Sequence, residues 1–287
     1  MQTLENSLAL AHFRDAEARV HRRTDLLFGV LFVVQFIGAV VATILLTPRT
    51  WSGSESSVHI HVWAGLGIGA LLCIMPLILI VFRRGQPVTR YTIAVAQMLY
   101  SALLIHLSGG RIEAHFHIFG SLAFLAFYRD WRLLIPATGV VLVDHVVRGL
   151  FWPESVFGVL VASPWRSLEH AGWVVFEDMF LAISCIQSRR EMKAIAVSQA
   201  ETEGARDSTE RLVEERTEDL RKQTEALARS EERFRLAVQG AQHGIWDWNL
   251  KTNKVFYAPR WKQLIGCDDA EIGDSPEEWL SRIVSER

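Results

Sequence analysis

The sequence lacks the cysteine content of a disulfide-stabilised or zinc-finger protein. Only three cysteines occur in 287 residues, Cys73, Cys185 and Cys267, and no two of them form a CxxC pair. Thiols this far apart imply neither a disulfide framework nor a cysteine-based metal site. An apolar N-terminal signal peptide is also missing, because the first 25 residues are polar and charged. Any insertion into a membrane must therefore come from internal segments.

An excess of basic charge is absent as well. Lysine and arginine number 30 against 32 acidic residues, for a formal net charge of -2, and no basic stripe is visible. A nucleic-acid-binding protein needs a concentrated positive surface to neutralise phosphates, so we expect no nucleic-acid partner. The sequence has apolar residues instead, which make up half of the total and concentrate in its first two thirds.

Six apolar segments recur between residues 26 and 186. A membrane-spanning helix needs about 20 apolar residues, with a range of about 17–25, and the first two segments meet this requirement. The others are shorter or carry polar residues, which is tolerated where neighbouring helices shield them. We predict six spans in a lipid bilayer, with four or five spans and short re-entrant segments as the alternative. The segments are 26–46, 62–82, 92–107, 115–128, 133–150 and 171–186.

Basic residues alternate between the two ends of these segments. They are frequent in every second connection and scarce in the others, and positively charged loops mark the cytoplasmic side of a membrane. We therefore expect a multi-pass protein with both termini in the cytoplasm, including an amphipathic N-terminal segment, 1–25. The basic residues that indicate this orientation are Arg14, Arg19, Arg22, Arg23, Arg83, Arg84, Arg90, Arg129, Arg132, Arg189, Arg190 and Lys193.

Histidines collect at the opposite, outer ends of the predicted spans. Imidazole is the commonest metal-binding side chain, and an ionisable group inside a membrane is a functional candidate. The orientation is predicted from basic residues alone, and the histidines all fall near its outer side. This agreement supports a functional layer of histidines. We interpret His59 as a loop residue. The candidate metal ligands are His61, His106, His115, His117, His145 and His170.

The short loop between the third and fourth spans would let His106 and His115 face each other. His115 and His117 would diverge on a regular helix. Nitrogen and oxygen donors suit zinc, copper, nickel or iron. The same residues are also compatible with three alternatives: a haem b held by two histidines, a small organic ligand, or a purely structural polar network.

Acidic residues accompany the histidines. Five are candidates for supporting or coupling roles, either as acceptors for ligand imidazoles or as charges within the sixth span. Glu177 follows His170 by seven residues, so both lie on about the same face of a helix. Asp144 and Arg148 are four residues apart, a spacing that favours a structural ion pair. The five acidic candidates are Glu113, Asp144, Glu169, Glu177 and Asp178.

Residues 187–229 have the composition of a helical linker, rich in charged residues and alanine and free of proline. Apolar residues recur every seven positions there, at Val213, Leu220 and Leu227, and again at Phe234. This is a coiled-coil spacing, but the second half of the seam is polar. We predict a marginally stable homodimeric coiled coil, with a solvated single helix as the alternative.

From residue 230 the pattern changes again. A helix is expected to end near Gly240, followed by strand-forming residues at 245–248, a turn at 249–253 and a second strand at 254–257. The lead-in 230–234, the run GIWDW from Gly244 and the stretch 257–266 with Arg260 and Trp261 resemble the start of a PAS domain. This resemblance implies an incomplete α+β sensor and dimerisation fold over 230–287, and hence a chain that stops inside it.

The stretch HFHIFGSLAFLAFYRDWR, 115–132, resembles the histidine-rich, multi-spanning sensory modules found ahead of some bacterial sensor kinases and chemoreceptors. Together the resemblances imply a mostly α protein of the bacterial inner membrane: a six-helix transmembrane sensor domain over 26–186, a coiled-coil linker and a partial PAS domain.

We expect the sensory input module of a signal-transduction protein, in first place a sensor histidine kinase whose partner is a response regulator. An input module of a diguanylate cyclase, a membrane metalloenzyme and a transporter are the alternatives. No phosphoacceptor-histidine segment, ATP-binding glycine box or GGDEF-like motif occurs in these residues, so we expect no catalytic residues.

Overall fold

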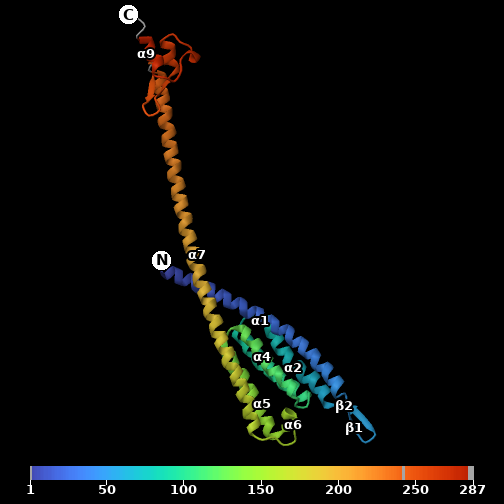
Figure 1. Cartoon of the computed structure of the whole chain (residues 1–287). Coiled ribbons are helices and arrows are strands. Elements are labelled where there is room, and N and C mark those ends of the chain that lie inside the picture. Colours follow the sequence, from blue (N-terminus) through green and yellow to red (C-terminus); the bar gives the residue numbers. More distant parts are fainter. Residues whose placement is uncertain (1, 241–242, 284–287) are drawn as a thin grey trace. The chain divides into compact units, whose positions relative to one another are not determined.

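The computed structural model describes residues 2–240 and 243–283 (Figure 1). The chain divides into two compact units, one up to Ala205 and the other from Arg206. The 76-residue helix α7, Trp165–Gly240, contributes to both. The sixth apolar segment and the linker are thus parts of one continuous helix, because no proline falls between them.

Helices make up nearly all of the first unit. They are joined by short turns, apart from a small antiparallel hairpin between α1 and α2 in which Arg49 lies opposite Val58. The elements are α1 (Gln2–Leu46), β1 (Arg49–Ser52), β2 (Glu55–Val58), α2 (Ile60–Phe82), α3 (Pro87–Leu107), α4 (Ile112–Leu125), the 3-10 turns η1 (Ala126–Tyr128) and η2 (Trp131–Leu133), α5 (Leu134–Phe151), α6 (Pro153–Phe157) and α7.

Four helical segments of the described residues are long and apolar enough to cross a membrane: Asn6–Leu46, Ile60–Phe82, Pro87–Leu107 and Trp131–Phe151. The fourth predicted segment is the shorter helix α4, of 14 residues, and the sixth is the first part of α7. The structure thus supports several membrane-type helices, while the count of six stays a prediction.

Helix α3 lies at the centre of the bundle. It contacts α1, α2, α4, α5 and α6, and its side chains Ile93, Met98 and Tyr100 are almost completely buried. The outer faces of the bundle are apolar instead, with Leu71 68% and Val81 73% exposed on α2. A continuous exposed apolar surface is unfavourable in water and suits a hydrocarbon environment.

A buried carboxylate joins three parts of the bundle. Asp25 of α1 is 0% exposed, and its Oδ1 accepts a hydrogen bond of 2.6 Å from the Tyr128 hydroxyl at the end of η1. Its Oδ2 accepts a second bond of 2.6 Å from the Gly85 N–H in the turn between α2 and α3. The Phe28 ring stacks on Tyr128 at 5.8 Å between ring centres. These contacts fix the middle of α1 to the turn after α2 and to the 3-10 turn after α4.

The second unit ends in a small α+β fold. Strands β3 (Trp246–Asn249) and β4 (Lys254–Tyr257) form an antiparallel hairpin in which Trp246 pairs with Tyr257. The elements after it are α8 (Pro259–Leu264), the 3-10 turn η3 (Asp269–Glu271) and α9 (Glu277–Ile283). Helix α7 and both strands end within one residue of the positions that the sequence predicts.

The core of this small fold is aromatic. Tyr257 stacks on Trp261 with ring centres 4.3 Å apart, and Val255 and Ile272 complete the buried cluster. A side chain at Gly244 would place its Cβ 2.6 Å from the Trp261 Cα, so this close approach requires glycine. Local packing therefore explains the glycine in this part of the pattern that resembles a PAS domain. The assignment to that fold remains a prediction.

We predict that the substitution Tyr128→Phe lowers the free energy of unfolding by about 1–3 kcal/mol, because buried Asp25 loses a hydrogen-bond donor. Tyr100→Phe is the matched control, since the Tyr100 hydroxyl is buried without a hydrogen-bond partner among the described residues. Thermal unfolding in detergent should show a lower Tm for Tyr128→Phe and an unchanged or higher Tm for Tyr100→Phe. Equal shifts for the two variants would contradict this role for Asp25.

Candidate functional site

The predicted site histidines occupy one end of several helices of the bundle. His61 is in the first turn of α2, His106 in the last turn of α3 and His115 in the first turn of α4. His145 lies in the last part of α5 and His170 near the start of α7. Because consecutive helices run in opposite directions, these positions fall at the same end, and the ring contacts below divide them into two groups.

Three imidazoles from three different helices meet in the first group. The ring centres of His115 and His145 are 5.4 Å apart, those of His115 and His170 5.2 Å, and those of His145 and His170 5.7 Å. We call these residues the three-histidine group. His115 and His145 are each 3% exposed, and the Phe157 ring lies 5.3 Å from that of His170. The group thus joins α4 and α5 to α7.

The same backbone contact orients all three rings. Each Nδ1 atom lies within hydrogen-bonding distance of the carbonyl oxygen four residues earlier on its own helix, at 3.0 Å for His115, 3.0 Å for His145 and 2.9 Å for His170. A carbonyl only accepts, so Nδ1 carries the proton and Nε2 keeps its lone pair. The Nε2 atom of His115 is buried and has no hydrogen-bond partner among the described residues.

His59, His61 and His106 form the second group. The His61 ring centre lies 4.3 Å from that of His59 and 4.9 Å from that of His106. His106 also contacts the Trp152 ring at 4.9 Å. The ring contacts of His106 are with His61 and Trp152, whereas those of His115 are with His145 and His170. His59, interpreted from the sequence as a loop residue, caps α2 by accepting a hydrogen bond from the His61 N–H.

A chain of polar contacts connects the two groups. The Ser155 hydroxyl lies 2.9 Å from His106 Nδ1 and accepts a hydrogen bond of 3.0 Å from Arg148. Arg148 makes a two-pronged ion pair with Asp144, at 2.8 Å and 2.5 Å. Asp144 Oδ2 in turn lies 3.4 Å from His145 Nδ1. The Asp144–Arg148 ion pair predicted from the four-residue spacing is thus confirmed; it contacts His145 directly and His106 through the Ser155 hydroxyl.

His117 lies outside both groups. It diverges from His115 as expected for a regular helix, and its Nε2 lies 2.9 Å from Gln35 of α1. Its Nδ1 lies 2.8 Å from the Ser101 hydroxyl of α3. The Gln35 and Ser101 contacts were missed by the sequence reasoning. The signal that could have identified them is a polar residue inside an otherwise apolar segment, since such groups need partners in a membrane.

The acidic candidates are spread over different surroundings. Glu113 is exposed on the first turn of α4, whereas Glu169 lines a pocket of about 620 Å³ together with His115, His170 and Trp173. Further along α7, Asp178 Oδ2 accepts a hydrogen bond from the Thr138 hydroxyl of α5. Glu177 Oε2 is buried without a hydrogen-bond partner among the described residues.

Within the described ranges, no group of three or more His, Cys, Asp or Glu side chains is placed so that it could hold a metal ion. The three-histidine group brings three ring centres within 5.2–5.7 Å of one another, and the His115 Nε2 is buried without a partner among the described residues. Chemically, three neutral imidazoles can donate lone pairs to a cation or to a hydrogen-bond donor.

Known proteins resemble parts of this chain. It is 34% identical over 133 residues to the transducer protein Htr8 of Halobacterium salinarum, a match that covers 42% of this chain and 20% of the transducer. It is 39% identical over 44 residues to the hybrid signal transduction histidine kinase A of Dictyostelium discoideum, which covers 15% of this chain and 2% of the kinase. The chain thus spans a fifth or less of each relative. No family model and no solved structure matches.

We predict that Gly110→Ala destabilises the turn between the two helices that carry His106 and His115. An alanine Cβ at this position would lie 2.3 Å from the backbone nitrogen of Gly158. Gly109→Ala is the matched control, because Gly109 has a similar φ of +72° but nothing within 4 Å of the added carbon.

Gly109→Ala is expected to lose about 1–2 kcal/mol through left-handed backbone strain alone. Gly110→Ala should lose about 1–3 kcal/mol more through overpacking. Chemical unfolding of both variants measures the difference. Equal losses would show that the contact between Gly110 and Gly158 is unimportant.

Proposed function

We propose that this chain is the sensory input part of a membrane-bound signal-transduction protein, and that its three-histidine group binds a transition-metal ion. The observation that carries the proposal is the convergence of three imidazoles from α4, α5 and α7, each with its Nδ1 proton held by its own helix. Both relatives carry signalling names, a transducer and a histidine kinase, which supports a signalling role.

The spacing of the rings fits a small ion. Three imidazoles bound to one tetrahedral ion at a metal–nitrogen distance of about 2.0–2.1 Å place their ring centres about 5.2 Å apart. The observed separations of the ring centres, 5.2, 5.4 and 5.7 Å, are close to this value. Histidine ligands usually donate their other ring N–H to a carbonyl or carboxylate, as all three do here.

The chemistry of the donors limits the choice of ion. Imidazole nitrogens suit zinc, copper, nickel and iron, and Glu169, which lines the adjoining pocket with His115 and His170, is available as an oxygen donor. A bound divalent ion would supply positive charge and fixed bond lengths between α7 and the other two helices. A haem b held by two of the histidines is the alternative for the same residues, and an absorption spectrum separates the two.

Helix α7 is the element through which binding would be communicated. It carries His170, is held to α5 by the bond between Asp178 and Thr138, and continues without interruption to Gly240. A ligand shifts a conformational equilibrium only if its contacts differ between the two states. Nε2 ligation of His170 provides such a difference, because it would hold α7 in one position against α4 and α5.

The proposal includes a homodimer. Almost every side chain of α7 beyond residue 206 is exposed, including the apolar stripe Val213, Leu220, Leu227 and Phe234. A stripe of this spacing is buried when a second copy supplies the facing helix. The polar residues between its members, such as Arg216 and Gln223, would keep the pairing weak and adjustable.

The apolar segments and the arginine pattern support a further proposal of six spans with both termini on the cytoplasmic side of a bacterial inner membrane. The resemblances in sequence support two more: a PAS fold from residue 230 and an output that acts through a response regulator. A diguanylate cyclase output is the alternative for the same input part.

We predict that the purified chain holds one metal ion and that His115→Ala removes it. Loss of one of three protein ligands should weaken binding by at least about 10–100-fold, since even changes to supporting residues have that effect. Metal content by inductively coupled plasma mass spectrometry and an absorption spectrum of the same sample provide the measurement.

His117→Ala is the matched control, because it removes an imidazole from the same helix two residues away, outside the three-histidine group. Metal retained by His115→Ala would contradict the site, as would equal loss from both variants at equal Tm. If metal were lost only from a His61→Ala, His106→Ala double variant, the site would be assigned to the second group. A Soret band would show that the bound group is haem and not a single ion.

We also predict that Leu227→Cys forms a disulfide-linked dimer in membranes faster than Glu232→Cys. Leu227 lies on the apolar stripe, whereas Glu232 lies on the opposite face of α7 five residues later. Non-reducing gels compare both variants with the parent chain, which retains its own three cysteines. Similar rates for the two positions would indicate that the stripe does not form a dimer interface.

A further inference from the structure

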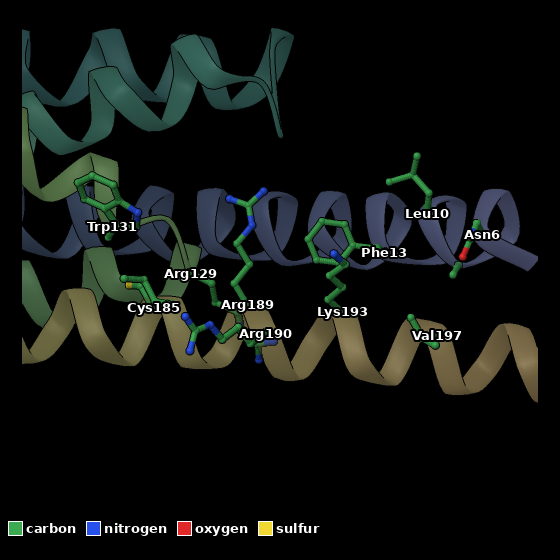
Figure 2. A pocket seen from close by; sticks show the side chains of 12 residues that line it. Asn6, Leu10, Phe13, Arg129, Trp131, Cys185, Arg189, Arg190, Lys193 and Val197 are labelled. Carbon is green, nitrogen blue, oxygen red and sulfur yellow. The ribbon is translucent and has the colours of Figure 1, made fainter. Parts of the chain in front are cut away.

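A second pocket lies at the other end of the bundle, between the first part of α1 and α7 (Figure 2). Its volume is about 580 Å³. Asn6, Leu10 and Phe13 line it from α1, and Ile186 and Val197 from α7, with Arg129 and Trp131 between α4 and α5. We call it the basic pocket, because four of its lining residues are cationic and none is acidic: Arg129, Arg189, Arg190 and Lys193.

The cations of the basic pocket are only partly neutralised by the protein. Arg189 reaches toward α1, where it pairs with Glu17 at 2.9 Å and lies 5.6 Å above the Phe13 ring. Among the described residues, the hydrogen bond of the Arg129 guanidinium goes to the sulfur of Met192, at 3.8 Å. Arg190 and Lys193 are exposed and make no ion pair within the described residues. Three positive charges therefore remain available to an anion.

The backbone at Arg129 adopts an unusual conformation. Its φ of +57° lies in the left-handed region, which non-glycine residues adopt infrequently and at a cost in free energy. The turn at Arg129 places its side chain among the residues that line the basic pocket. Arginine is well suited to phosphate, because its guanidinium donates two parallel hydrogen bonds.

The apolar part of the lining indicates what the anion is attached to. Leu10 and Trp131 are 48% and 41% exposed, and the α7 part of the lining, which runs from Cys185 to Val197, starts where the apolar segment 171–186 ends. Apolar side chains beside arginines at the end of membrane-type helices match a lipid with a charged headgroup. Basic pockets between membrane helices bind such headgroups elsewhere, and tryptophan is enriched at this depth.

We propose that the basic pocket binds one anionic phospholipid, with its phosphate among Arg129, Arg190 and Lys193 and its acyl chains along Leu10, Trp131 and Ile186. The lipid would connect α1 to α7 at the end of the apolar segment of α7. The pocket is separate from the three-histidine group, so this proposal does not depend on metal binding.

The test is native mass spectrometry of the whole chain in detergent, titrated with phosphatidylglycerol or phosphatidylcholine. The variant Arg190→Gln, Lys193→Gln removes two charges that hold no partner in the described structure, so folding should be unaffected. Each basic side chain beside an anionic headgroup contributes about a fivefold gain in affinity, and the double variant should bind phosphatidylglycerol roughly 25-fold more weakly. Phosphatidylcholine should bind weakly to both proteins.

The matched control is Arg83→Gln, Arg84→Gln, which removes the same charge from the turn between α2 and α3, outside the basic pocket. This control should retain the affinity of the parent chain. If both double variants lost the same affinity for phosphatidylglycerol, the effect would be a general attraction between charges. That result would overturn the proposed binding site. Equal binding of phosphatidylcholine, or displacement of phosphatidylglycerol by inorganic phosphate alone, would overturn the assignment to an anionic lipid.

Discussion

The structure depends on one constraint: a polar group inside an apolar helix bundle must find its partner within the protein. The bundle satisfies this constraint repeatedly at the two ends of its helices. At one end, Asp25 accepts hydrogen bonds from Tyr128 and Gly85, and at the other the imidazoles of the three-histidine group bond to their own backbone carbonyls. Other polar contacts lie away from these two clusters, such as those of His117 with Gln35 and Ser101 and that of Thr138 with Asp178.

The same constraint explains why the three-histidine group is a candidate for binding and His117 is not. Both nitrogens of His117 have partners, Gln35 and Ser101, so its hydrogen-bonding capacity is used by the fold. His115 has one nitrogen satisfied and one buried without a partner in the described structure. A buried unpaired acceptor costs free energy, and a bound cation or donor would remove that cost. The two histidines of α4 therefore differ in whether both ring nitrogens have a hydrogen-bond partner.

Helix α7 takes part in several of these contacts, which is relevant to a signalling role. It contributes His170 to the three-histidine group, Asp178 to the contact with Thr138 and Arg190 and Lys193 to the basic pocket. Binding events at either end of the bundle would therefore act on one rigid element.

The sequence alone determined the helices, because hydrophobic segments, the absence of proline and the seven-residue spacing are local properties. It also determined the hairpin at 246–257 and the Asp144–Arg148 ion pair, whose partners are a few residues apart. The tertiary structure decided which histidines meet. The sequence placed His61, His106, His115, His145 and His170 in one layer, but the rotation of each helix about its axis depends on how α3 packs against its neighbours. That packing separates His106 from His115 and brings His170 to His145, and no spacing along the chain encodes it.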